Sequence, residues 1–320
     1  MSTLKTRMKK EINHITSEAV ESAQQTLRNG DLIGLPTETV YGLAANALSD
    51  KAVAKIYTLK ERPRFNPLIA HFPNAAEAQK YVHFNEWAKT LSETFWPGPL
   101  TLILKKKEDC GISLLATAGL DTLAVRVPAH PIAQQLLQGL EFPLVAPSAN
   151  PSESLSPTTA QHVKRSFPDL LVVDGGSCTV GLESTIVDLT GNTPVILRPG
   201  LLTKNDIEKA LLLTLGDKAE SNVIKAPGQL KRHYAPSIPL RLNIKNLHEG
   251  EALLSFGPHT FTARKEINLS LTCNLEEAAG NLFAALAELD SSQYKGIAVM
   301  PIPNDGIGLA VNDRLNRASA

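Results

Sequence analysis

The 320-residue sequence lacks several features that would define its class. Its three cysteines, Cys110, Cys178 and Cys273, lie far apart and form no C-x-x-C pair, which argues against a structural zinc site and a disulfide framework. No apolar run approaches the roughly 18 residues that a membrane span needs, and residues 1–11 lack the apolar core of a secretory signal. We therefore expect a cytoplasmic protein without a membrane partner.

An excess of charge of one sign is also absent, because 32 Lys and Arg residues balance 32 Asp and Glu residues. No overall field draws the chain to nucleic acid, so strong direct binding to a long nucleic acid is not expected. The signatures G-x-x-x-x-G-K-[ST], H-E-x-x-H and G-x-S-x-G are missing as well. A nucleotide bound here is therefore not held by a P-loop, and we predict no metal-ligating residues.

Hydrophobic patterning predicts a mixed α/β domain over residues 1–215, built around a twisted sheet. Short apolar runs predict strands at 32–35, 68–72, 100–104, 123–127, 143–146, 171–173, 185–189 and 195–197. Helices are predicted over Ser17–Arg28 and 50–59. A third helix is expected to open at Ser156 and Pro157, a cap residue followed by proline.

The sequence changes character after Gly216. Residues 216–239 are polar, contain Ala226-Pro227-Gly228 and His233-Tyr234-Ala235-Pro236, and are too many for an ordinary connection. We interpret them as an interdomain linker and, because of the aromatic segment next to proline, as an active-site lid. Residues 240–320 are expected to form a smaller three-layer α/β domain, with strands near 240–244, 252–256 and 296–300 and helices at Leu275–Leu289 and near 310–318.

Two cations in Lys60-Glu61-Arg62-Pro63 indicate an anion site. Pro63 and Pro67 stiffen the loop that we expect to carry them. An arginine fork and a mobile lysine charge together suit a triphosphate or a bicarbonate-like anion. A surface ion pair with Glu61 is the alternative, and the Lys-x-Arg pattern alone favours it; the polar segments around it favour the anion site.

Other polar segments follow short apolar strands. Thr37 and Thr39 could bind the ammonium and hydroxyl of a small ligand, and capping of a turn explains them equally well. Arg126 interrupts an apolar strand, so it needs either a ligand carboxylate or a structural Asp or Glu. Several strand ends can converge on one concave site, and the segments that would do so are Ser148-Ala149-Asn150, Gly181-Leu182-Glu183-Ser184 and Arg198-Pro199-Gly200.

Taken together, these segments resemble the YrdC-like family of threonylcarbamoyl-AMP synthases, in its long form with a carboxy-terminal extension domain. The resemblance is strong over about residues 15–213 and rests on segments in the family's order: Pro36 to Leu43, Lys60-x-Arg62-Pro63, Asn66-Pro67-Leu68, Trp96 to Thr101, Ala124 to Pro128, Ala146 to Asn150, Glu183 to Ile186 and Arg198-Pro199-Gly200. The linker segments, Asn312 and Arg314 extend it to the long form. One departure is Ala44, where the family more often has glycine.

The resemblance implies a YrdC-like twisted mixed sheet with helices, plus a smaller Rossmann-like second domain. It implies that L-threonine, bicarbonate and ATP react to give threonylcarbamoyl-adenylate and pyrophosphate, with Mg²⁺ bound mainly through the ATP phosphates. The product would pass to a tRNA threonylcarbamoyl transferase complex that makes N6-threonylcarbamoyladenosine, without strong tRNA binding by this chain itself.

The resemblance also implies residue roles. Threonine would contact Thr37, His71, Arg126 and Ser184, and ATP would contact Lys60, Arg62, Ser148, Asn150, Arg198 and Tyr234, with Lys60 and Arg62 catalytic. Two other functions stay open. The first is carbamoyl transfer through a carbamoyl-adenylate, as in larger relatives of the same domain, although their zinc-finger or acylphosphatase-like units are not visible in this sequence. The second is an RNA-binding module that acts in translation. The neutral charge balance weighs against the last.

Overall fold

The structure is a computed structural model, and it describes residues 17–216, Pro227 and residues 234–320. The strands are β1 Ile33–Leu35, β2 Gly42–Asn46, β3 Ile69–His71, β4 Leu100–Lys105, β5 Thr122–Arg126, β6 Leu144–Val145, β7 Leu171–Val172, β8 Thr185–Asp188, β9 Val195–Arg198, β10 Leu240–Arg241, β11 Glu251–Ser255, β12 Glu266–Asn268 and β13 Gly296–Val299. The helices are α2 Ser17–Arg28, α3 Asp50–Lys60, α4 Ala75–Ala78, α5 Glu86–Phe95, α6 Leu114–Thr117, α7 Pro131–Gln138, α8 Ala160–Ser166, α9 Lys204–Leu211, α10 Leu275–Leu289 and α11 Gly308–Ala318.

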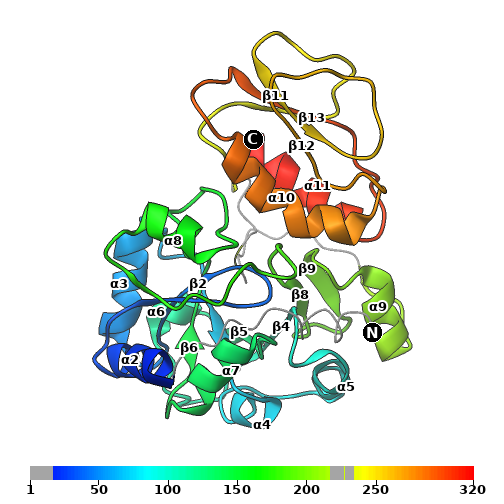
Figure 1. Cartoon of the computed structure of the whole chain (residues 1–320). Helices are drawn as coiled ribbons and strands as arrows, with labels where there is room; N and C mark the ends of the chain where they lie inside the picture. The colour runs from blue at the N-terminus through cyan, green and yellow to red at the C-terminus, as the bar shows by residue number, and fades with distance from the viewer. Residues whose placement is uncertain (1–16, 217–226, 228–233) are drawn as a thin grey trace.

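The larger sheet is mixed, as the sequence predicted. Its nine strands run in the order β7-β1-β2-β6-β3-β5-β4-β8-β9, with helices around it (Figure 1). Strands β3 and β5 are parallel, whereas β4 is antiparallel to β5. Every strand predicted for this part has a counterpart. The sequence did not predict β2, because glycine and alanine in Gly42–Asn46 have weak strand preference.

The two faces of the central strands differ in what covers them. Ala70 of β3 and Val125 of β5 pack in the main core with Ile56 of α3. Ile69 and Ala124, one place earlier on each strand, belong to a small cluster made only of strand residues. Because side chains alternate along a strand, this second face is distinct from the helix-covered one. The pocket described below lies over it.

The expected third helix start was wrong. Helix α8 begins at Ala160, and its cap is Thr159, whose hydroxyl accepts from the His162 amide. Pro157 lies outside this helix because its carbonyl accepts the Tyr41 amide at 2.8 Å, and the Ser156 hydroxyl is used elsewhere, as described below. Tertiary hydrogen bonds therefore override a good local start signal.

The second sheet is entirely parallel, in the order β10-β13-β11-β12. Helices α10 and α11 pack on one face and lie between this sheet and the first domain (Figure 1). On the other face Leu253 and Ala298 pack against loop residues such as Leu247 and Phe261. The expectation of three layers was therefore wrong for this domain. It has one layer of helices and one sheet, and loops cover the other face of the sheet because the short connections on that side carry no helix.

The two domains share a hydrophobic cluster. Val40 and Leu182 of the first domain are buried with Tyr234 and with Phe283 of α10. Within the residues that the structure describes, no helix combines the length and apolarity needed to cross a membrane.

Candidate active site

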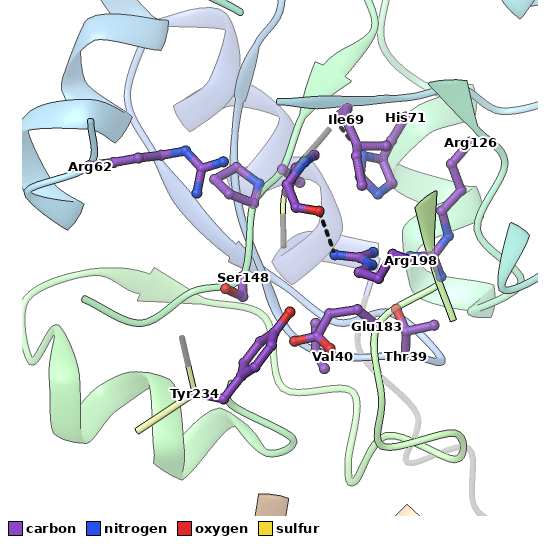
Figure 2. Close-up of a pocket in the computed structure, with 13 residues that line it drawn as sticks. Thr39, Val40, Arg62, Ile69, His71, Arg126, Ser148, Glu183, Arg198 and Tyr234 are labelled. Atoms are coloured by element: carbon purple, nitrogen blue, oxygen red, sulfur yellow. Dashed lines mark hydrogen bonds between the residues drawn. The ribbon is translucent and has the colours of Figure 1, made fainter. Parts of the chain in front are cut away.

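A pocket lies over the strand-only face of the larger sheet (Figure 2). His71, Arg126 and Arg198 are the last residues of β3, β5 and β9, and all three line it. The register pairs His71 with Arg126, and Arg198 with Ile186. Their side chains therefore share the face that carries Ile69 and Ile186. Strand alternation thus gathers three basic residues in one concave site.

Two guanidinium groups in this pocket form no salt bridge with a carboxylate of the described residues. Arg62 donates to the carbonyls of Asn66 at 3.2 Å and Pro67 at 3.0 Å. Arg198 donates to the Ser184 carbonyl at 3.1 Å and to the Ser184 hydroxyl at 3.2 Å. Burial lowers the pKa of Arg62 to about 10 and also lowers the pKa of Arg198. Both guanidiniums are hydrogen-bonded by neutral groups, and Glu183 acts on Arg198 only through its charge, so these two buried cations favour an anionic ligand.

Lys60 lies behind the pocket wall. It is the last residue of α3, and its ammonium donates to the carbonyl of Ser148 at 2.5 Å and to that of Asn150. Burial, followed by the charge of Arg62, holds the pKa of Lys60 well below its usual range. Both Lys60 and Arg62 are buried, with exposures of 1% and 8%. Of the two cations expected on this loop, Arg62 lies on it, whereas the placement of Lys60 was wrong because Lys60 belongs to α3.

The partner of Arg126 is a structural carboxylate. Its Nη2 lies 2.7 Å from Glu38 Oε1, and both side chains are 4% exposed. The second Glu38 oxygen accepts from the Ala129 amide at 3.0 Å. Of the two partners that the sequence left open, the structure shows this one, while Arg126 still lines the pocket. The sequence analysis did not identify Glu38 as the partner of Arg126, because nothing in residues 37–39 indicates contact with a strand residue 88 positions away.

His71 is neutral at ordinary pH. Its Nδ1 lies 3.1 Å from the Ile69 carbonyl, an acceptor, so Nδ1 carries the proton and Nε2 is the free acceptor. Burial, followed by the charge of Arg126, lowers the pKa of His71 to about 3. The ring therefore offers a hydrogen-bond acceptor to a ligand, such as an amine or hydroxyl, without adding positive charge.

Within the first loop, Thr39 lines the pocket and Thr37 does not. The Thr37 hydroxyl donates to the Val40 carbonyl at 2.6 Å and accepts from the Thr39 amide at 3.2 Å. It caps the turn, which the sequence had left as one of two options. The Ser184 hydroxyl is similarly committed, to Thr101 at 2.7 Å as well as to Arg198.

The Ser148-Ala149-Asn150 segment contributes Ser148 to the pocket wall. The Asn150 amide nitrogen donates to the carbonyls of Pro151 and Ser154, at 3.0 Å and 2.8 Å. Its Oδ1 and that of Asn66 are buried and accept no hydrogen bond among the described residues. Such unpaired acceptors are unusual in a folded protein, and they favour a donor supplied by a ligand or by water.

Glu183 and Tyr234 close the opposite side of the pocket (Figure 2). Glu183 accepts from the Ser156 hydroxyl at 2.5 Å and from Arg314 at 3.0 Å. Burial alone would raise the pKa of Glu183, but the charges of Arg314 and Arg198 hold it below its usual value. Burial raises the pKa of Tyr234 to about 12, so its hydroxyl keeps its proton. His233 lies outside the described residues.

The described residues contain no group of three or more His, Cys, Asp or Glu side chains that could hold a metal ion. Glu183 is the carboxylate on the pocket wall, and its oxygens are used by Ser156 and Arg314.

The fold and this cationic pocket define a two-domain protein of the Sua5 and YrdC class. A family model described as "Telomere recombination", for Sua5, YciO and YrdC proteins, matches residues 25–200, and the model of the threonylcarbamoyl-AMP synthase C-terminal domain matches residues 202–320. Threonylcarbamoyl-AMP synthase of Pyrococcus abyssi is 40% identical over 92% of each chain. Its Bacillus subtilis counterpart is 37% identical over 94% of this chain and 92% of that one.

A solved structure of P. abyssi Sua5 with L-threonine matches with a TM-score of 0.88 and 36% identity over 96% of both chains. Escherichia coli YciO matches the first domain, with a TM-score of 0.53 and 25% identity over 59% of this chain and 93% of that one. The chain belongs to the threonylcarbamoyl-AMP synthase family, in its two-domain form. The resemblance found in the sequence is therefore confirmed.

Proposed function

We propose that this chain forms threonylcarbamoyl-adenylate and pyrophosphate from L-threonine, bicarbonate and ATP. The observation that carries the proposal is the pair of buried guanidiniums, Arg62 and Arg198, which line the pocket and form no salt bridge with a carboxylate among the described residues. A polyphosphate supplies the missing charge and accepts from their N–H groups. The family membership supports ATP as the polyphosphate and threonine as the amine.

The reaction first joins the threonine amine to bicarbonate, forming a carbamate and releasing water. A carbamate oxygen then attacks the α-phosphorus, the bond to the β-phosphate oxygen breaks, and pyrophosphate leaves. Charge develops on the phosphate oxygens, where fixed cations stabilise it most. Arg62 and Arg198 take this role, while Lys60 holds the Ser148-Ala149-Asn150 backbone that borders the phosphates.

Threonine is placed beside His71 and Arg126. The free Nε2 of His71 accepts from the amine or the hydroxyl, and Arg126 meets the carboxylate beside its existing partner Glu38. Mg²⁺ is held mainly by the ATP phosphates and neutralises part of their charge. The product serves N6-threonylcarbamoyladenosine formation in tRNA and passes to a transferase complex.

The linker acts as a lid. The free volume of the pocket is about 40 Å³, far below the roughly 300–1,000 Å³ of a site for a ligand of ATP size. Among the described linker residues, Pro227 and Tyr234 lie on its wall, and the Pro227 carbonyl accepts from Arg198 at 3.5 Å. Movement of Pro227 and Tyr234 away from the pocket wall would open the pocket. Closure over a bound adenylate would exclude water and protect it from hydrolysis.

A coupled assay tests the function. The purified chain is supplied with ATP, Mg²⁺ and bicarbonate and with each amino acid in turn, and pyrophosphate and the adenylate are measured. Pyrophosphate release that depends on both threonine and bicarbonate is expected. Release that depends on carbamoyl phosphate instead would establish the carbamoyltransferase alternative, and no ATP turnover with any amino acid would overturn the proposal.

A further inference from the structure

One arginine of the second domain reaches the pocket wall from behind. Arg314 lies on α11, and its side chain is 0% exposed. Its Nε donates to Glu183 Oε2 at 3.0 Å, and its Nη1 donates to the Pro199 carbonyl at 2.7 Å. Both acceptors belong to the first domain. Glu183 lines the pocket, and Pro199 directly follows the pocket residue Arg198.

The same guanidinium also holds Tyr234. Its Cζ lies 5.5 Å from the centroid of the tyrosine ring, within the range of a cation–π contact. The ring of Phe283 on α10 packs against Tyr234 with a centroid distance of 5.4 Å. Tyr234 has a φ of 66°, a left-handed conformation that a bulky residue rarely adopts. Such a conformation persists where its surroundings hold it, and α10 and α11 supply those contacts.

We propose that Arg314 is a positioning residue for adenylate formation, which holds the Glu183 carboxylate and the Tyr234 ring in place around the bound substrates. The inference rests on the function proposed above. It gives the second domain a direct part in the reaction, because one of its side chains sets two groups on the pocket wall. Neutralising Arg314 would remove the more strongly acting of the two positive charges that stabilise the buried Glu183 carboxylate, and that loss is large for a buried pair.

Arg317 provides a matched control on the same helix. It lies less than one turn beyond Arg314, and its guanidinium pairs with Asp313 at 3.0 Å. Arg314 also contacts Asp313, at 2.9 Å, so both arginines belong to one charged cluster. Only Arg314 reaches the residues of the pocket wall in the bonds described above. Loss of Arg317 therefore removes a charge from the same cluster, while the bonds of Arg314 to Glu183 and to the Pro199 carbonyl remain.

The experiment compares Arg314→Met, Arg314→Lys and Arg317→Met in the full chain, with kcat and KM measured for ATP and for threonine well below the unfolding temperature. Arg314→Met is expected to lower kcat by about 100-fold with little change in either KM, because Arg314 touches neither substrate. Arg314→Lys keeps the charge without the planar fork and is expected to lose about 10-fold. Arg317→Met is expected to stay within about 2-fold of wild type.

A double-mutant cycle with Glu183→Gln separates positioning from general stabilisation. If Arg314 acts through Glu183, the double variant is no slower than the slower single variant, whereas independent effects would multiply. Should Arg314→Met fail to fold, Arg314→Lys enters the same cycle. Multiplicative effects, or an equal loss of kcat in Arg317→Met, would overturn the inference. Because the wild type is assayed alongside, failure of the proposed function is recognised separately, as a wild type that makes no adenylate.

Discussion

The buried pair of Glu38 and Arg126 makes a strong prediction about stability. In Glu38→Gln the shape of residue 38 is kept, and its side-chain oxygen can still accept from the Ala129 amide. Arg126, whose side chain is 4% exposed, then keeps its charge without a carboxylate. Removing one partner of a buried pair lowers the free energy of unfolding by about 3–5 kcal/mol. Because the hydrogen bond to Ala129 is kept, we expect a loss of about 3 kcal/mol for this variant. The melting temperature should fall by roughly 6–12 °C.

L-Threonine should reverse part of this loss. If threonine binds as proposed, its carboxylate shares Arg126 with Glu38 in the wild type, whereas in the variant the threonine carboxylate is the one that meets the buried Arg126 charge. Differential scanning calorimetry with and without threonine is therefore expected to show a larger rise in melting temperature for Glu38→Gln than for wild type. The double variant Glu38→Gln with Arg126→Met removes both charges and should be more stable than Glu38→Gln alone.

Two results would refute this reasoning. A melting temperature of Glu38→Gln within about 2 °C of wild type would show that the pair does not stabilise the fold. An equal threonine-induced shift in both proteins would show that Arg126 does not meet the threonine carboxylate. In that case Arg126→Met, which we expect to raise the KM for threonine more than that for ATP, should instead affect ATP.

Three further predictions follow from the site. Lys60→Met and Arg62→Met should both slow adenylate formation, and both should also lower the melting temperature because these cations are buried. Pyrophosphate release at the wild-type rate would contradict their assignment to the site of adenylate formation. His71 has a pKa of about 3 when folded and 6.5 in the unfolded chain, so its contribution to stability is full above pH 6.5 and is lost as the pH falls toward 3. In urea unfolding between pH 7 and pH 5, the free energy of unfolding of the wild type should fall by about 2 kcal/mol more than that of His71→Asn. Equal losses in the two proteins would contradict a neutral buried ring. Truncation after Gly216 should lower the yield of adenylate and raise its hydrolysis, since Tyr234 is removed; full activity of the truncated form would contradict the lid.

The sequence alone predicted the elements whose signals are local. Helix α10 was predicted with its observed bounds, Leu275–Leu289, because its apolar residues repeat at helical spacing over four turns and Asn274 caps it. The strands of the first domain other than β2 were found because their apolar runs end at turn residues. The family was recognised for a related reason, since its pocket segments are short and contiguous, and each can be read without knowing what it contacts.

Tertiary structure decided which of the candidate side chains reach the pocket. Thr37 caps its own turn while Thr39, two positions later, lines the pocket, a choice that depends on the direction in which the loop crosses the sheet. Lys60 and Arg62 are separated by one residue in the sequence, yet Lys60 binds backbone carbonyls behind the pocket wall and Arg62 lines the pocket.

Pairing across long separations was equally beyond the sequence. Glu38 meets Arg126 across 88 residues, and Glu183 meets Arg314 across 131 residues. A sequence shows that a buried charge needs a partner, because desolvation is costly, but it does not show which of 32 acidic residues supplies it. The register of β3, β5 and β9 and the packing of α11 made those choices, because they determine which side chains meet once the chain has folded.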